Sequence, residues 1–325
     1  MKMTRLQGRV LASGIELVLG PVALEDGGVL LVEARAGRLI HLLPNGERRT
    51  VAQVSGRLTG AALGPNGYCY IGSSGGADWR TEKGKADCIH LGADHGGGCI
   101  QKVDLGTGVV EALYTHCQGI PLSEPRDIVF DDQDGFWFID IKKKLNERHA
   151  SSCLYYAHGD GSSIRRVADD LHATGGLGLS PDGRTLYATE AQTGRLWGYS
   201  IGAPGELSQK RRLFAGSGQL MHFPSNNPRH GSLAVEENGN VCIASPVEGG
   251  ISVFSEQGRL LEFHMTPETC CTDICFGGPN SQTAYITLFS GRQVLAVSWP
   301  RPGLNLYKHS VTRHSYEKHP VPLIS

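Results

Sequence analysis

Apolar and polar positions along this chain repeat in one pattern six times. In each copy a short apolar run leads to an acidic or small residue, then usually to Asp-Gly or Asn-Gly, and then to a second apolar run. The copies lie at 20–34, 60–72, 126–140, 175–190, 231–245 and 272–288. Gly beside Asp or Asn tolerates the positive φ of tight turns, so each copy predicts a two-stranded hairpin.

A second hairpin-like stretch follows each copy, at 37–47, 98–113, 153–167, 194–207, 249–263 and 291–304. Two hairpins make a four-stranded antiparallel blade, and six blades in a ring predict an all-β, six-bladed β-propeller. No stretch has a helical period, so we expect little helix. The ring is a single domain over 1–325, with the propeller at 10–304 and a poorly ordered tail at 305–325.

Strand direction predicts where the longer links lie. If each first strand begins on one face, its Asp-Gly turn lies on the other face, and the link to the third strand returns to the first. The links at 73–97, 114–125, 141–152, 208–230 and 264–271 therefore gather on the face where the innermost strands begin. Long loops over a rigid scaffold are where binding and catalysis usually occur.

Composition narrows the class of protein. Of the 325 residues 40% are hydrophobic and 19% charged, and the net charge of -1 gives no basic excess for nucleic acid. The apolar runs are too short to cross a membrane, and the start of the chain lacks the apolar core of a signal peptide. We expect a cytoplasmic protein, a monomer or weak homo-oligomer, whose nine scattered cysteines are reduced thiols.

Several motifs in this order resemble the SMP-30/gluconolactonase/LRE family of six-bladed propellers, which includes calcium-dependent sugar lactonases and organophosphate hydrolases. The resemblance runs from about Val10 to Leu304. It rests on the motifs Gly20-Pro21-Val22, Phe136-Trp137-Phe138, Leu179-Ser180-Pro181-Asp182-Gly183-Arg184, Gly194-Arg195-Leu196-Trp197, Phe276-Gly277-Gly278-Pro279 and Trp299-Pro300-Arg301-Pro302-Gly303.

The resemblance also implies a site for one divalent cation at the bottom of a funnel, held by a Glu, two Asn and an Asp. In this chain those four positions are Leu19, Arg126, Gly175 and Gly231. A hard cation such as calcium needs about six to eight oxygen ligands, and none of these side chains supplies one. We therefore expect no metal and no other cofactor, with calcium or zinc at a non-standard site as the alternative.

Other positions that the resemblance places in the pore have changed as well. Thr59 and Ser73 stand where the family has Asn, and Asp273 stands where Thr-Asn is usual, whereas Asp127 and Thr272 match the pattern. The candidate catalytic residues are Arg126, Asp127, Asp273 and His230. The candidate substrate-binding residues are Leu19, Thr59, Ser73, Trp79, Gly175, Gly231 and Thr272.

The replacements predict that a side-chain cation stands where a bound cation would otherwise lie. Glycine and leucine leave room for Arg126, which needs a carboxylate or an anion within reach, and Asp127 and Asp273 are the candidates. Arg126 would supply fixed positive charge to a developing oxyanion or enolate. In the alternative interpretation it fills space and joins strands through a salt bridge.

Other polar residues near this face carry weaker hypotheses. His230 lies at the expected funnel rim, where it is either an acid or base or a solvated loop residue. Asp140 and Glu190 end second strands and are expected to hydrogen-bond loops. Cys270-Cys271 lacks a paired base, which argues against a nucleophilic thiol.

The insertion 73–97 has two interpretations. Cys88, His90, His95 and Cys99 invite a zinc site, but their spacing does not match the common paired-ligand forms. We expect a mobile lid that offers Trp79 as an apolar contact.

The resulting hypothesis is an enzyme of secondary metabolism or catabolism that acts on a small, partly apolar molecule without the family's metal. It would catalyse acid-base ring opening, cyclisation, isomerisation or carbon–carbon bond chemistry as a hydrolase, lyase or cyclase. The first alternative is a metal-dependent lactone or ester hydrolase that binds its cation through Asp127, Asp273 and the 73–97 insertion. The second is a non-catalytic propeller that binds a small molecule.

Overall fold

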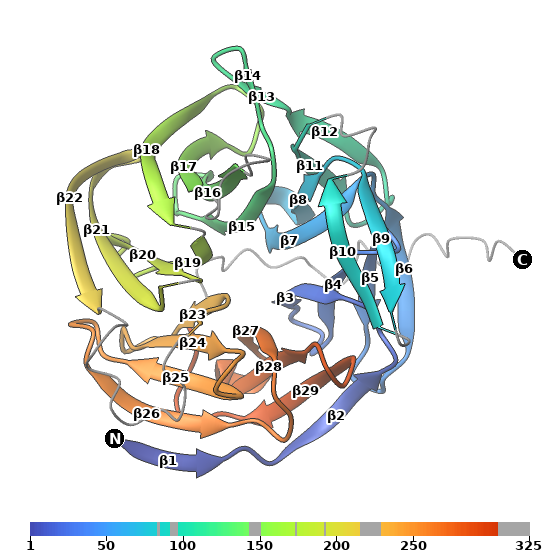
Figure 1. Ribbon diagram of the computed structural model, residues 1–325, viewed down its shortest axis with the longest axis vertical. Helices are drawn as coiled ribbons and strands as arrows, with labels where there is room; N and C mark the ends of the chain where they lie inside the picture. Colours follow the sequence, from blue (N-terminus) through green and yellow to red (C-terminus); the bar gives the residue numbers. More distant parts are fainter. Residues whose placement is uncertain are drawn as a thin grey trace, which may run out of the picture.

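The protein is a ring of six blades around a central axis (Figure 1). The computed structural model describes residues 1–82, 85–91, 97–142, 151–172, 174–191, 193–214 and 229–304. Within these ranges the only helical segments are two 3-10 turns, η1 (Pro65–Gly67) and η2 (Pro279–Ser281). No described helix has the length and apolar character needed to span a membrane. The expected all-β propeller with four antiparallel strands in each blade is confirmed.

The first three blades follow the predicted order of strands. Blade 1 contains β3 (Val18–Ala23), β4 (Val29–Glu33), β5 (Arg38–Leu42) and β6 (Arg48–Gln53). Blade 2 contains β7 (Arg57–Leu63), β8 (Tyr68–Ser74), β11 (Cys99–Asp104) and β12 (Val110–Tyr114). Blade 3 contains β15 (Pro125–Phe130), β16 (Gly135–Lys142), β17 (Ser151–His158) and β18 (Ile164–His172).

The last three blades close the ring. Blade 4 contains β19 (Thr174–Leu179), β20 (Thr185–Glu190), β21 (Arg195–Ala203) and β22 (Glu206–Phe214). Blade 5 contains β23 (Leu233–Val235), β24 (Val241–Ser245), β25 (Gly250–Phe254) and β26 (Leu260–Met265), with β1 (Lys2–Arg5) added in parallel at its outer edge. Blade 6 contains β27 (Cys271–Gly277), β28 (Thr283–Leu288), β29 (Gln293–Ser298) and β2 (Gly8–Ser13).

The sixth blade corrects one expectation. The stretch 291–304 does not form a hairpin, because β29 is its only strand and β2 from the start of the chain supplies the outer strand, with Val10 opposite Leu295. Pro300 and Pro302 lack the amide hydrogen that a ladder needs, so the chain cannot continue there as a regular strand. Pairing of the two ends of the propeller joins its first and last blades.

The apolar core is divided into six clusters, and each cluster lies between two neighbouring blades. Between blades 2 and 3, for example, Tyr70 and Phe130 meet edge to face with ring centroids 4.7 Å apart. Between blades 4 and 5, Tyr187 and Leu196 pack with Ile243 and its neighbours. Each blade therefore buries both faces against other blades, and removing one blade would expose two apolar surfaces.

Two short hairpins interrupt the repeat, both on the face where the inner strands begin. The first consists of β9 (Ala77–Glu82) and β10 (Lys85–Leu91), in the link between the second and third strands of blade 2. The second consists of β13 (His116–Cys117) and β14 (Ile120–Pro121), in the link to blade 3 (Figure 1). The insertion expected at 73–97 thus contains regular backbone structure.

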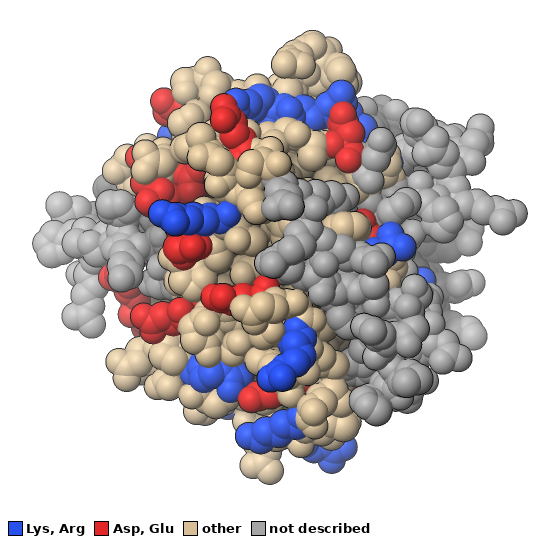
Figure 2. All heavy atoms as spheres, turned by 90° about the vertical axis from the view of Figure 1, so that its left-hand side faces the viewer, with Lys and Arg blue, Asp and Glu red and all other residues tan. Residues whose placement is uncertain are grey.

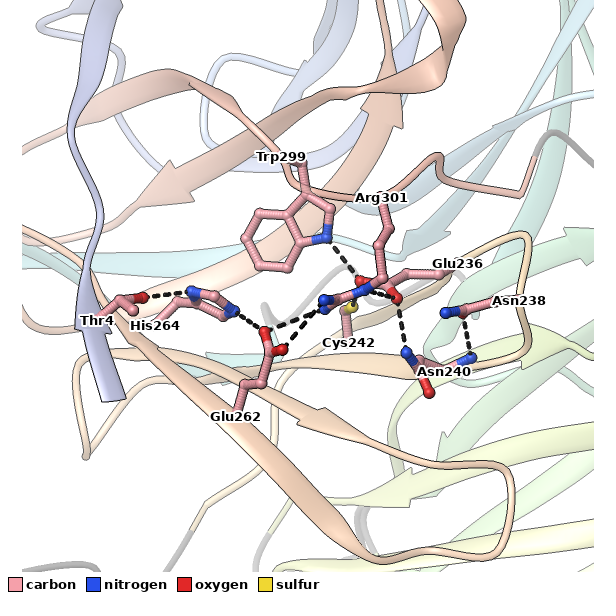
Figure 3. A network of polar contacts seen from close by, with 9 residues as sticks. All are labelled: Thr4, Glu236, Asn238, Asn240, Cys242, Glu262, His264, Trp299 and Arg301. Carbon is pink, nitrogen blue, oxygen red and sulfur yellow. Dashed lines mark hydrogen bonds and ion pairs between the residues drawn. The ribbon is translucent and has the colours of Figure 1, made fainter. Parts of the chain in front are cut away.

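A buried carboxylate fixes the segment that follows β29 (Figure 3). The side chain of Glu236 is 0% exposed and accepts hydrogen bonds from Nε1 of Trp299 at 2.7 Å, Nε of Arg301 at 2.5 Å and Nδ2 of Asn240 at 2.8 Å. Three donors, one of them a guanidinium, compensate for the desolvation of this carboxylate.

The same arginine links this segment to the start of the chain (Figure 3). Nη1 and Nη2 of Arg301 each lie 3.1 Å from an oxygen of Glu262, which also contacts Nε2 of His264 at 2.8 Å. Nδ1 of His264 lies 2.6 Å from the hydroxyl of Thr4 in β1. The network therefore joins both ends of the described chain to blade 5.

Charged side chains on one side of the ring form no large patch of a single sign. Figure 2 shows this side, on which acidic and basic side chains of the described residues are interspersed. It gives no indication of an electrostatic surface built for a polyanion.

Candidate functional site

The starts of the six inner strands meet around the axis of the ring (Figure 1). These strands are β3, β7, β15, β19, β23 and β27, and five of them have a register shift near the start. A β-bulge interrupts the alternation of side chains and bends the strand. Three of the positions at which the family resemblance placed metal ligands, Leu19, Arg126 and Gly175, therefore lie in or beside distorted backbone, whereas Gly231 precedes β23, for which no shift is found. We call the polar residues at these starts the floor.

Arg126 is held by a carboxylate that was not among its expected partners. Its Nε donates to Oε1 of Glu124 at 2.7 Å, and its Nη2 contacts the same oxygen. The expected partners, Asp127 and Asp273, act on Arg126 through their negative charges, which help to raise its pKa. Glu124 lies directly before β15, two positions from Arg126 in the chain.

Arg57, at the start of β7, donates to the same oxygen of Glu124 from Nη2 at 2.5 Å. The Glu124 side chain is 1% exposed and that of Arg57 9%, whereas that of Arg126 is 34% exposed. Two arginines from neighbouring blades thus share one buried carboxylate. Of these two arginines, Arg126 is the one that presents a substantial part of its side chain to solvent.

Asp127 lies in the bulge of β15 with a φ of 23°, which is unusual for a residue other than glycine. Its Oδ2 accepts hydrogen bonds from the backbone N–H of Leu177 at 2.9 Å and from Oγ of Ser232 at 3.0 Å. The carboxylate from blade 3 therefore contacts blade 4 and the segment that enters blade 5. The structure adds Ser232 to the site residues.

Asp273 lies beside the bulge of β27 and is 7% exposed. Its carboxylate accepts from Oγ1 of Thr287 at 3.2 Å and from the backbone N–H of Gly20 at 3.4 Å, so it joins blades 6 and 1. Both predicted acids are thus on the floor, where each forms contacts between blades.

Burial raises the pKa of both acids. For Asp127, desolvation is the largest cause and the negative charge of Asp273 the next, and together they raise the pKa to about 7. Hydrogen bonds from Leu177 and Ser232, and the charge of Arg126, oppose this change in pKa. Desolvation likewise raises the pKa of Asp273, against hydrogen bonds that favour its ionised form. Asp127 can therefore exchange a proton near neutral pH.

The two glycines at former ligand positions have a structural explanation. A Cβ on Gly175 would lie 2.6 Å from the carbonyl oxygen of His230, and a Cβ on Gly231 would lie 2.5 Å from that of Thr272. Neighbouring inner strands approach each other too closely there for any side chain. The expectation that these glycines make room for Arg126 is not supported. Leu19 packs against the apolar cluster between blades 1 and 2.

The hydroxyl groups that were predicted to bind substrate form hydrogen bonds within the protein. Oγ1 of Thr59 donates to the carbonyl of Pro125, and Oγ1 of Thr272 lies 2.7 Å from that of Thr287. Ser73 is 3% exposed and lies between Nε2 of Gln101, at 2.8 Å, and another backbone carbonyl. These groups connect strands, and Thr59 orients the chain directly before Arg126.

His230 is buried at 3% exposure, so its expected position at a solvated rim is wrong. Its ring meets Phe254 edge to face at 6.0 Å between centroids. Desolvation lowers its pKa to about 4, against hydrogen bonds with the backbone of Gly194 and Arg229. The imidazole is therefore neutral at physiological pH.

Asp140 and Glu190 form loop contacts, as expected. Asp140 accepts from the backbone N–H of Ser123 at 2.9 Å and of Glu124 at 2.7 Å, which positions the segment that carries Arg126. Oε2 of Glu190 accepts from Oγ1 of Thr193 at 2.5 Å. Asp140 thus supports the backbone directly before Arg126, and Glu190 contacts the turn between β20 and β21.

The cysteine and zinc hypotheses have different outcomes. Cys271 is fully buried, and desolvation raises its pKa to about 12, so it is a poor nucleophile. The side chains of Trp79, Cys88, His90 and His95 lie outside the described residues, so the zinc hypothesis and the contact expected of Trp79 remain predictions.

A surface hollow of about 290 Å³ near Tyr68 and Lys102 lies on the opposite face and contains no predicted site residue.

The floor does not fit the divalent cation that the fold family implies. The four former ligand positions contribute no oxygen donor from their side chains, and one of them carries the positive charge of Arg126. Within the described part of the chain, no group of three or more His, Cys, Asp or Glu side chains could hold a metal ion. A cation beside this guanidinium would also meet direct electrostatic repulsion.

Comparison with known sequences identifies a protein family that this chain matches. The model of the SMP-30/gluconolactonase/LRE-like region matches residues 19–290. The lactonase drp35 of Staphylococcus epidermidis is 23% identical over 132 residues, which cover 41% of this chain and 38% of the lactonase. For the lactonase drp35 of Staphylococcus aureus, 23% identity extends over 242 residues, 72% of this chain and 64% of the lactonase. The chain thus aligns with less than two thirds of these relatives' length.

Solved structures share the architecture. A gluconolactonase from Xanthomonas campestris superposes with a TM-score of 0.68 at 20% identity, covering 90% of this chain and 89% of that one. Regucalcin, a calcium-binding protein from Agrobacterium tumefaciens, gives a TM-score of 0.71 at 15% identity, covering 93% and 98%. Identities this low show the shared fold alone. With a family match over most of its length and a six-bladed ring to accompany it, this chain belongs to the SMP-30/gluconolactonase/LRE-like family.

Proposed function

We propose that this protein is a lactonase-type hydrolase in which Arg126 provides the positive charge that a metal ion would otherwise provide. The observation that carries the proposal is the fixed position of Arg126: its Nε and Nη2 edge is bound to a buried carboxylate, while part of the side chain remains exposed. A preorganised cation in a partly desolvated site stabilises negative charge that develops during a reaction.

The reaction would use Asp127 as the base. In its ionised form Asp127 removes a proton from a water molecule as the water oxygen attacks the lactone carbonyl carbon. The carbonyl oxygen gains the negative charge, which Arg126 stabilises. The ring carbon–oxygen bond then breaks, and Asp127 returns the proton to the departing ring oxygen. The product is a hydroxycarboxylic acid, which releases its proton in solution.

The pKa of Asp127 suits this role, because a base with a pKa of about 7 is both available and effective near neutral pH. Ser232 and Leu177 orient its carboxylate through hydrogen bonds. Asp273 would act through its charge, which raises the pKa of Asp127. The pKa of about 4 makes His230 a weak base, and its burial argues against contact with substrate.

Among the reactions in our wider hypothesis, hydrolysis is the one that the relatives favour, since both sequence relatives named above are lactonases and one of the similar structures is a gluconolactonase. Cyclisation, isomerisation and carbon–carbon bond chemistry gain no support from a particular contact. Metal-independent turnover in a catabolic or secondary pathway remains part of the proposal.

The test combines metal analysis of the purified protein with turnover of a panel of γ- and δ-lactones, with and without EDTA. We expect ring opening that survives EDTA and no stoichiometric divalent metal. A bound metal whose removal abolishes turnover would instead support the metal-dependent alternative. Tight binding of a lactone without conversion would support the non-catalytic alternative.

A further inference from the structure

The triad of Arg57, Arg126 and Glu124 has one more positive charge than negative charges. Arg57 and Arg126 each carry a full positive charge, and among the described residues Glu124 is the carboxylate that both contact, so the triad has a formal charge of +1. The carboxylate is 1% exposed and cannot turn toward solvent without losing both partners. This excess charge is therefore fixed in position.

Arg126 presents its excess charge in a geometry suited to a second carboxylate. A guanidinium has five N–H groups and can bind carboxylates along two edges. Glu124 occupies the edge formed by Nε and Nη2. Nη1 has no hydrogen-bond partner among the described residues, and 34% of the side chain is exposed. The edge formed by Nη1 and Nη2 is thus available to a ligand.

Few other charges among the described residues face this edge. Asp127 from β15 and Asp273 from β27 act on Arg126 through their charges, whereas the starts of β3 and β19 and the segment before β23 carry the uncharged Leu19, Gly175 and Ser232. If both aspartates were ionised, they would outweigh the excess charge of the triad. An anion on Arg126 would therefore favour protonation of one of them. We assign the proton to Asp127, which directly follows Arg126 in β15 and whose pKa burial raises to about 7.

We propose that the floor is a carboxylate-binding site, in which Arg126 binds a small organic monocarboxylate while Asp127 takes up a proton. If the proposed hydrolysis is correct, the hydroxycarboxylate product is the natural ligand, and it inhibits the enzyme more strongly at lower pH. A monoanion fits better than a phosphate dianion, because only one excess positive charge is available and two aspartates lie nearby.

Isothermal titration calorimetry tests binding without any need for turnover. The probes are 4-hydroxybutyrate, its neutral isostere 4-hydroxybutyramide, and inorganic phosphate, each at pH 6 and pH 8. We expect the carboxylate to bind at least about tenfold more tightly than the amide at pH 6. Above the pKa of Asp127, the affinity for 4-hydroxybutyrate should fall by up to about tenfold for each pH unit, since binding then requires proton uptake. Binding heats in buffers of different ionisation enthalpy should show this uptake.

Variants separate the two parts of the proposal. Arg126→Gln should abolish the preference for the carboxylate. If that variant does not fold, Arg126→Lys takes its place in the experiment and should retain part of the preference. Asp127→Asn should bind the carboxylate with little dependence on pH. Arg184→Gln, at an exposed arginine in the turn after β19, is the control and should behave like the parent.

Three results would overturn the proposal: equal affinity for amide and carboxylate, a preference for phosphate over the carboxylate, or an Arg126→Gln variant that binds like the parent. A pH dependence that persists in Asp127→Asn would refute the assignment of the proton. Carboxylate binding without lactone turnover would uphold this inference and refute the proposed hydrolysis, whereas turnover without carboxylate preference would refute this inference alone.

Discussion

Nε of Arg126 lies 2.7 Å from Oε1 of Glu124, so the exposed cation of the floor is anchored by an acid two positions before it in the chain. Arg57 binds the same oxygen from the neighbouring blade. This arrangement distinguishes the two roles expected of Arg126. A purely structural salt bridge would need only the buried contact, whereas a catalytic or binding role also needs the exposed edge.

Replacing Arg126 tests which role matters. Arg126→Ala should lower kcat/KM for a lactone by about 10²-fold or more, because the developing oxyanion loses its preorganised cation. The buried Glu124 would retain Arg57, so the fold should survive. Steady-state kinetics and thermal unfolding measure the two effects. Unchanged turnover in a folded variant would make the residue structural, and Arg184→Ala is the matched control.

The activity should depend on the ionisation of Asp127. Its pKa of about 7 predicts that kcat/KM rises with pH and levels off above about 8, since only the carboxylate can accept a proton from water. Ser232→Ala removes a hydrogen bond that favours the ionised form, so the midpoint should move to higher pH. A pH profile in both proteins gives the answer. An unchanged midpoint would show that a group other than Asp127 controls the rise of kcat/KM with pH.

The same group affects stability, with a sign that can be worked out. The folded-state pKa of Asp127 is raised above its unfolded value of about 3.9, so its contribution to stability is fully present below that value and is lost as pH rises through about 7. Asp127→Asn cannot ionise, so urea denaturation should show a larger gain in stability over the parent at pH 8 than at pH 5. A gain that does not change with pH would contradict this assignment.

The floor glycines should not tolerate a methyl group. Gly175→Ala and Gly231→Ala would place a Cβ within 2.6 Å and 2.5 Å of carbonyl oxygens from the adjoining inner strands. We expect each to lower the free energy of unfolding by about 1–3 kcal/mol or more, as overpacking does elsewhere. In β21, Gly202→Ala is the control, because its nearest neighbour would be the Cβ of Ser208 at 3.9 Å. Chemical denaturation compares all three.

The network at the closure of the ring should be sensitive to loss of its arginine. Arg301→Met would leave the buried Glu236 without its guanidinium partner and would weaken the contacts of Glu262. Breaking a buried pair in this way costs about 3–5 kcal/mol. Arg35→Met breaks a half-exposed pair with Glu16 and should cost at most about 1 kcal/mol. Equal losses of unfolding free energy in the two variants would contradict a special role for the closure network.

Much of the fold follows from local chemistry. Alternating apolar runs and turns such as Asp182-Gly183, where Gly183 has a φ of 67°, specify hairpins within about 15 residues of chain. Repeated six times, such hairpins can bury their faces only against one another. The outer strand of blade 6 could not be predicted in this way, because β2 and β29 are at opposite ends of the sequence.

For the site as well, the sequence determined some features and the tertiary structure determined others. Comparison of the repeats was enough to place Arg126, Asp127 and Asp273 at the starts of inner strands, since equivalent positions of repeated blades face the same axis. Only the tertiary structure showed that Arg126 is held by Glu124, which also binds Arg57, and that the groups beside Gly175 and Gly231 are carbonyls from neighbouring blades. Contacts between blades depend on bulges and on shifts in atomic position of about a few tenths of an ångström. Packing across the ring decides both, and a repeat pattern does not encode that packing.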